Sequence, residues 1–114
     1  MNTIYVADLI SSKIAVSPDK GEILYNSIKN EISNKNKVNV SFKNIEDLTT
    51  AFLNKAIGNL YNCFTSESLN EYLSISDLDD LDKYLLNKVI TRAKIDIKTD
   101  ETLRKNIDEV FDNE

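Results

Sequence analysis

Two adjacent hydroxyl side chains, Thr49 and Thr50, occupy the position in this chain that best suits recognition chemistry. They follow an alternating segment containing Val38, Val40 and Phe42 and precede a run of helical spacing, which predicts a corner where a strand turns into a helix. The first backbone N–H groups of a helix have no partners within it, so such a corner tolerates an anion. A threonine at a helix start is also the ordinary capping residue, and both roles remain open.

The chain has no histidine and one cysteine, Cys63. Histidine-assisted serine or cysteine catalysis and histidine-based zinc sites are therefore impossible within it. Cys63 has no histidine to activate it, so we interpret it as a passive residue, and a single cysteine agrees with a reducing cytoplasm. We predict that the chain is not an enzyme and that it holds no cofactor.

A run of closely spaced carboxylates lies between Asp77 and Asp82. It does not match a calcium loop, because no glycine turns it and Lys88 stands where a bidentate glutamate is needed. We predict no metal site and interpret the run as the solvated start of a helix. In that interpretation Ser76 is the cap and accepts a hydrogen bond from the N–H of Asp79.

Composition is that of an ordinary folded protein, with 114 residues, 41% of them hydrophobic and 29% charged, which predicts one domain over 1–114. A net charge of −5 disfavours nucleic acid and anionic membrane as partners. No apolar run approaches the roughly 20 residues of a membrane span, and Asp8 and Ser11 interrupt the N-terminal segment, unlike a signal peptide. We expect a cytoplasmic protein.

The N-terminal half predicts short strands around one helix. Apolar pieces at 3–10 and 13–16 suggest a hairpin or a bent strand. Ser17 and Pro18 are typical of a helix start, and a polar loop at 33–37 ends that helix. The residues expected on its buried face are Leu24, Ile28 and Ile32.

The central segment predicts a strand from Val38, a polar turn at 43–47 and a helix. The buried face of that helix is expected to hold Leu53, Ala56, Ile57, Leu60 and Tyr61. A polar connection at 63–70 and a strand at 72–75 follow. The next helix has an expected inner stripe of Leu78, Leu81, Leu85, Val89 and Ala93, widened by Leu86 and Ile90.

A brief edge strand at 95–97 and a final helix at 99–112, capped by Thr99, complete the predicted elements. The face of that last helix is Leu103, Ile107, Val110 and Phe111. The order of elements predicts an α/β (α+β) fold, with a mixed central sheet of about four or five strands covered by about four helices.

The segment from Val38 to Leu60 resembles the core of the STAS-like family of small bacterial domains. The family pattern is a strand, a tight turn, hydroxyl residues, a phenylalanine and a helix that closes on Gly-x-Leu. The matching residues are Phe42, Ile45, Leu48, Thr49, Thr50, Phe52, Gly58 and Leu60. The run from Ser17 to Leu24, with Gly21 inside it, is similar to the family's helix opening. The resemblance covers about 3–94 and implies a single STAS-like domain.

This family is similar to STAS domains such as anti-sigma factor antagonists. In those proteins a kinase-type ATPase phosphorylates a hydroxyl at the strand-to-helix corner, and the phosphate decides whether the two proteins bind. The resemblance implies a regulatory domain that binds a protein partner, and the partner it suggests is such a histidine-kinase-like ATPase. The implied phospho-acceptors or partner contacts are Thr49 and Thr50. The implied remaining interface is Asn44, Glu46, Asp47, Phe52 and Leu53.

The sequence departs from the family pattern at three positions of the corner. The strand-end aspartate is Ser41, the turn glycine is Asn44 and the third hydroxyl is Ala51. If the phospho-acceptor aligns with that third hydroxyl, Thr50 is the nearest substitute, and an unswitched binder is a second possibility.

Two other functions remain open from the sequence. The same helix N-terminus could hold a small ligand or a nucleotide, although no glycine loop is present to cradle a phosphate. The acidic balance and the run from Asp77 to Asp82 would also suit an acidic inhibitor protein from a mobile element.

Overall fold

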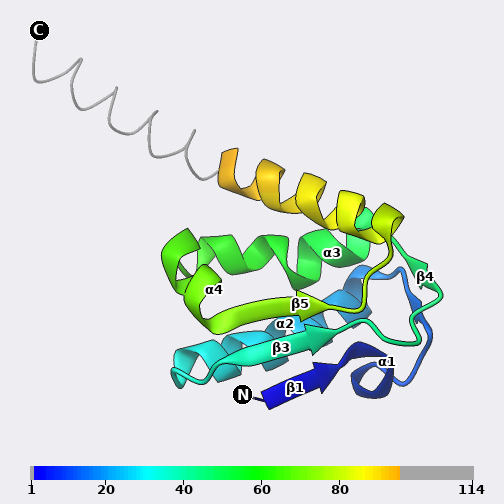
Figure 1. Cartoon of the computed structure of the whole chain (residues 1–114), viewed down its shortest axis with the longest axis horizontal. Helices are drawn as coiled ribbons and strands as arrows, with labels where there is room; N and C mark the ends of the chain where they lie inside the picture. Colours follow the sequence, from blue (N-terminus) through cyan, green and yellow to red (C-terminus); the bar gives the residue numbers. More distant parts are fainter. Residues whose placement is uncertain (1, 96–114) are drawn as a thin grey trace, which may run out of the picture.

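Three parallel strands form the centre of the fold, which a computed structural model describes over residues 2–95 (Figure 1). The strands are β1 (Asn2–Tyr5), β3 (Val38–Ser41) and β5 (Leu73–Ser76), in the order β1-β3-β5. In the middle strand, Val40 pairs with Ile4 on one side and Ile75 on the other. The strand predicted from Val38 onward is confirmed, and Val38 and Val40 are fully buried. The predicted alternation fails at the end of the strand, because Ser41 is fully buried as well.

A second, two-stranded sheet joins β2 (Ile14–Ala15) to β4 (Asp47–Leu48), again in parallel. The predicted α/β class is therefore confirmed. Over residues 2–95, however, the five strands belong to two parallel sheets and not to one mixed sheet. Parallel pairing follows from the connections, since helices separate each strand from the partner it pairs with.

The hairpin or bent strand expected from the apolar pieces at 3–10 and 13–16 is wrong, because β1 and β2 do not pair with each other. β1 runs directly into a helical turn, α1 (Val6–Leu9), and pairs with the distant β3. Val6 and Ile10 are both buried, and the N–H of Ile10 donates to the Val6 carbonyl at 3.0 Å. This four-residue spacing marks a helical turn, and the strand interpretation overlooked it.

The first long helix, α2 (Pro18–Ser33), begins as predicted. The Ser17 hydroxyl accepts a hydrogen bond from the N–H of Lys20 at 3.3 Å, and Pro18 is the first helical residue. The predicted inner face is confirmed by the buried side chains of Leu24, Ile28 and Ile32.

Gly21 allows α2 to pack closely against α3 (Thr50–Ala56). A Cβ atom at Gly21 would lie 2.8 Å from the carbonyl oxygen of Phe52 and 3.0 Å from Cβ of Lys55. No side chain fits at these distances without moving the backbone of α3. This glycine therefore fixes how near α2 comes to the helix that carries Thr50.

The buried face predicted for the central helix is confirmed, although the helix itself is interrupted. α3 ends at Ala56, and a 3-10 helix, η1 (Gly58–Asn62), carries the remaining residues of that face.

The polar connection expected at 63–70 is wrong, because α4 (Ser66–Tyr72) begins there. The Thr65 hydroxyl caps α4 by accepting from the N–H of Ser68 at 3.1 Å.

Residues 80–95 form a helix that lies beside α3 in Figure 1. The predicted Ser76 cap is wrong, because Ser76 belongs to β5 and the Asp79 carboxylate accepts from the N–H of Asp82 at 2.8 Å. The predicted inner stripe holds at its C-terminal part but fails at its start. Leu86 and Val89 are the buried residues, whereas Leu81 is 66% exposed.

Ile95 lies in this helix and not in an edge strand. The other residues of the expected edge strand, 96–97, and the expected final helix at 99–112 lie outside the described residues. Within residues 2–95, no helix is long and apolar enough to cross a bilayer.

Candidate functional site

The predicted corner begins with a tight turn directly after the carboxyl end of β3. The N–H of Ile45 donates to the carbonyl of Phe42 at 3.1 Å and closes the turn. Asn44 has a φ of 69°, a left-handed conformation that asparagine tolerates better than most residues other than glycine. Asn44 can therefore replace the turn glycine of the STAS-like pattern without changing the backbone.

Backbone hydrogen bonds attach the corner to β2 and to the residue before it. The N–H of Glu46 donates to the carbonyl of Lys13 at 2.8 Å, and the N–H of Thr49 donates to the carbonyl of Ala15 at 3.2 Å. Asp47 is also paired with Ile14 in the two-stranded sheet. These hydrogen bonds hold the corner against residues 13–15.

The two adjacent threonines have different roles in the structure. The Thr49 hydroxyl accepts from the N–H of Phe52 at 3.3 Å and donates to the carbonyl of Val16 at 3.0 Å, so it is engaged in both directions. Thr50 is the first residue of α3 and is half-buried. Its hydroxyl makes no hydrogen bond with the residues that the structure describes. Thr49 is therefore a helix cap, and the Thr50 hydroxyl is the one left available.

The residues proposed for a partner interface divide into two groups. Asn44, Glu46 and Asp47 are exposed, and so is Ala51. Phe52 and Leu53 have no exposed surface, because they belong to the core. The structure therefore corrects the expected interface by removing Phe52 and Leu53 from direct contact with a partner.

Two exposed apolar residues next to the corner escaped the sequence interpretation. Ile14 is 48% exposed and Val16 is 39% exposed. Both adjoin the corner, since Ile14 pairs with Asp47 and the Val16 carbonyl accepts from Thr49. The sequence signal was the apolar piece at 13–16, but its pairing with a segment some thirty residues later is not readable from local pattern.

A chain of polar side chains crosses the sheet beside the corner. The Ser74 hydroxyl donates to the side-chain oxygen of Asn39 at 3.0 Å, and the Asn39 amide donates to the Ser76 hydroxyl at 3.0 Å. The Asp77 carboxylate then accepts hydrogen bonds from the hydroxyls of both Ser76 and Ser41. This series of hydrogen-bonded side chains therefore connects the carboxyl ends of β3 and β5.

Asp77 explains how Ser41 can stand where the STAS-like pattern has an aspartate. Ser41 is fully buried at the end of β3, and Asp77 follows β5 in a left-handed conformation with a φ of 63°. A carboxylate is thus present at the strand end, but the neighbouring strand supplies it. The N–H of Lys43 donates to the Ser41 hydroxyl at 3.3 Å, which extends this arrangement into the turn of the corner.

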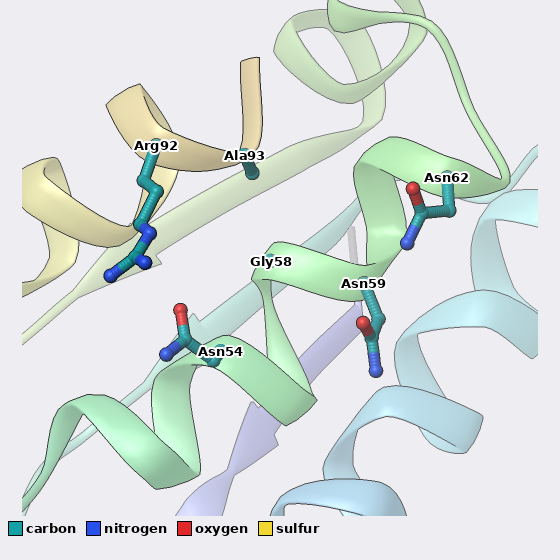
Figure 2. Close-up of a pocket in the computed structure, with 6 residues that line it drawn as sticks. All are labelled: Asn54, Gly58, Asn59, Asn62, Arg92 and Ala93. Carbon is teal, nitrogen blue, oxygen red and sulfur yellow. The ribbon is translucent and has the colours of Figure 1, made fainter. Parts of the chain in front are cut away.

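A polar cavity of about 260 Å³ lies between the end of α3, η1 and the helix over residues 80–95 (Figure 2). Figure 2 shows the Arg92 side chain extending toward Asn54, with the Asn59 and Asn62 amides on the opposite side. None of these four side chains makes a hydrogen bond or ion pair with residues 2–95. The cavity therefore presents one guanidinium and three amides. The residues lining it are Asn54, Gly58, Asn59, Asn62, Arg92 and Ala93.

Comparison with protein families decides the classification. A family model described as a STAS-like domain of unknown function matches residues 20–83. The chain belongs to this STAS-like family. No curated protein and no solved structure matches the chain. The matched range contains the corner, Gly21 and Asp77, so the resemblance stated from the sequence is confirmed.

Cys63 lies away from the corner of this STAS-like domain. It is exposed, and its sulfur lies 2.9 Å from the hydroxyl oxygen of Tyr25. That hydrogen bond, together with partial burial, raises the pKa of Tyr25 to about 12. The Lys29 ammonium lies 5.6 Å from the Tyr25 ring centroid. Because its pKa is raised, the Tyr25 hydroxyl stays protonated at neutral pH and does not serve as a base there.

Proposed function

We propose that this STAS-like domain is a non-catalytic bacterial regulatory module that binds a protein partner through the corner at 44–51. The observation that carries the proposal is the pair of threonines. One of them holds the corner in place, while the hydroxyl of the other, Thr50, makes no hydrogen bond with residues 2–95 and belongs to a half-buried side chain at a fixed part of the surface. The expected partner is the histidine-kinase-like ATPase that the family resemblance implies.

The surface around Thr50 suits protein recognition. Ile14 and Val16 offer apolar area, and Glu46 and Asp47 form a charged rim beside them. Protein interfaces commonly combine an apolar centre with a polar edge. Because backbone hydrogen bonds hold the corner, a partner would not bear the entropy cost of ordering it.

Phosphorylation of Thr50 would change this surface strongly. A phosphate adds a charge of about −1.5 to −2 at neutral pH. The first turn of α3 contains no acidic residue, so a phosphate there would lie at the positive end of the helix, with the carboxylates of Glu46 and Asp47 earlier in the corner. Thr49 is the poorer acceptor, since modifying it would disrupt the helix cap. If Thr50 is not modified either, the domain acts as an unswitched binder.

The test uses the tagged full chain to capture proteins from cells that encode it. Three forms are compared: the parent, Thr50→Asp, and the control Asn36→Asp, which adds the same charge in the exposed loop before β3. We expect capture of an ATPase of the histidine-kinase type that changes by at least about tenfold with Thr50→Asp and not with Asn36→Asp. Calorimetry with the purified ATPase then gives the affinities.

Mass spectrometry of the chain incubated with that ATPase and ATP separates the two forms of the proposal. A phosphate on Thr50 supports a switched module. Binding at the corner with no phosphate on any residue supports an unswitched one. Binding that neither Thr50→Asp nor Ile14→Glu alters would contradict the corner as the interface.

A second candidate function is binding of a small anion, which the cavity around Arg92 favours. A guanidinium and several amides can together satisfy the oxygens of a carboxylate or a phosphate. The α3 N-terminus is the weaker candidate for this role, because α3 has only 7 residues. A rise in melting temperature with inorganic phosphate or citrate that Arg92→Gln removes would support the cavity, and no rise with either anion would count against it.

A further inference from the structure

The helix over residues 80–95 has apolar side chains on two faces. Its inner face, at Leu86 and Val89, is buried against the domain. Its outer face leaves Leu81, Tyr84 and Ile95 exposed over 66%, 61% and 56% of their surfaces. Large apolar residues aligned on one surface commonly mark an interaction site. The outer face is therefore a candidate docking surface, separate from the corner.

The spacing on the outer face is that of a coiled-coil seam. Steps of three and four residues alternate along what we call the outer stripe: Leu81, Tyr84, Lys88, Thr91 and Ile95. Such alternation places one residue of every turn on the line where a second helix packs. A shallow hollow of about 430 Å³ runs along the stripe between Tyr84 and Ile95. The stripe thus has both the spacing and the room to receive side chains from another helix.

The charges beside the outer stripe identify the occupant. Asp80 precedes the stripe and Lys94 lies near its end, and at 3.6 residues per turn both fall on the same flank of the helix. In an antiparallel pair of identical helices, Asp80 of each copy lies opposite Lys94 of the other. A parallel pair would bring the two acidic ends together instead. The helix is therefore complementary to itself in the antiparallel direction.

We propose that a second copy of this chain docks on the outer stripe, helix against helix, in an antiparallel dimer. Two-fold symmetry then packs Leu81 of each copy against Ile95 of the other, and Tyr84 against Thr91. Lys88 lies at the axis, where the two ammonium groups repel each other while their alkyl stems cover apolar surface. The dimer is accordingly reversible, and Lys88 is the residue that limits its affinity.

The test is sedimentation equilibrium of the full chain over a range of concentrations. Leu81→Lys is expected to raise the dissociation constant by at least about tenfold, because it removes from both copies a leucine that is exposed in the single chain and buried by the dimer. Lys88→Leu is expected to lower that constant by a similar factor. Asp80→Lys and Lys94→Asp should each weaken the dimer, and combining them should restore it.

Thermal unfolding of each variant serves as the control for folding. Leu81, Asp80 and Lys88 are exposed, so their substitution should leave the fold intact. Lys94 also lies 5.9 Å from the Tyr61 ring centroid in its own copy, which makes Asp80→Lys the cleaner single swap. A parent chain that stays monomeric at every concentration overturns the proposal. So does a dimer that Leu81→Lys leaves unchanged, or a double swap that fails to restore association.

Discussion

The carboxylate of Asp77 accepts a hydrogen bond from the hydroxyl of Ser41, and this bond joins the carboxyl ends of β5 and β3. Ser41 is fully buried, so its hydroxyl depends on a partner within the protein. The bond lies next to the turn at 42–45, where the corner begins. Its importance for stability can be measured directly.

Ser41→Ala and Asp77→Asn should each lower the free energy of unfolding, and the double variant should lose less than the sum. Asparagine tolerates the left-handed backbone at position 77, so Asp77→Asn changes the charge without adding strain. The coupling is expected to be about 1 kcal/mol, because the asparagine side-chain oxygen can still accept from the Ser41 hydroxyl and only the charge-assisted part of the bond is lost. Urea denaturation of the four proteins measures it, and strict additivity would show that the charge of Asp77 does not strengthen the bond.

Gly21→Ala should destabilise the domain by about 1 to 3 kcal/mol, because the added methyl group meets the backbone of α3. Helix propensity alone would favour alanine by about 1 kcal/mol, so the sign of the change separates packing from propensity. Gly58→Ala is the matched control, since its nearest neighbour is a side-chain atom of Val89 at 3.4 Å. A stabilised Gly21→Ala would show that α2 and α3 can move apart at no cost.

Thr49→Ala should cost about 1 kcal/mol of stability, whereas Thr50→Ala should change it little. The difference follows from the structure, because the Thr49 hydroxyl caps α3 and also bonds to Val16, while the Thr50 hydroxyl makes no bond with residues 2–95. Chemical denaturation measures both. Equal losses would mean that Thr50 also has a structural role and is a poor candidate for modification.

Local patterns predicted those elements whose signals lie close together in the sequence. Ser17 and Pro18 started a helix as expected, and the alternation from Val38 formed a buried strand. α1 and α4 were missed because each is a short helix. Within α4, one buried residue, Leu69, lies among mostly polar residues, so the segment resembles a loop. Strand pairing could not be predicted from local patterns either, because the paired strands lie far apart in the sequence and are joined by crossover connections.

The candidate site was also predicted only in part from the sequence. The sequence placed Thr49 and Thr50 at a helix start, but only the structure shows that Thr49 bonds to Val16 and that Phe52 is buried. The outer face of the last described helix was missed for a related reason. Leu81 was assigned to the inner stripe because two apolar faces on one helix cannot be ranked by spacing alone.

Stability should fall between about pH 10 and pH 12 because of Tyr25. The hydrogen bond between Tyr25 and Cys63, with partial burial, raises the Tyr25 pKa to about 12, whereas the ordinary value in the unfolded chain is near 10. In this window the unfolded chain releases the phenolic proton while the folded chain keeps it, so rising pH favours unfolding. Cys63→Ala should return the Tyr25 pKa toward 10, and ultraviolet absorbance of tyrosinate, with Tyr25→Phe as the reference, measures the change. A Tyr25 pKa that stays at about 12 in Cys63→Ala would assign the shift to burial instead of the hydrogen bond.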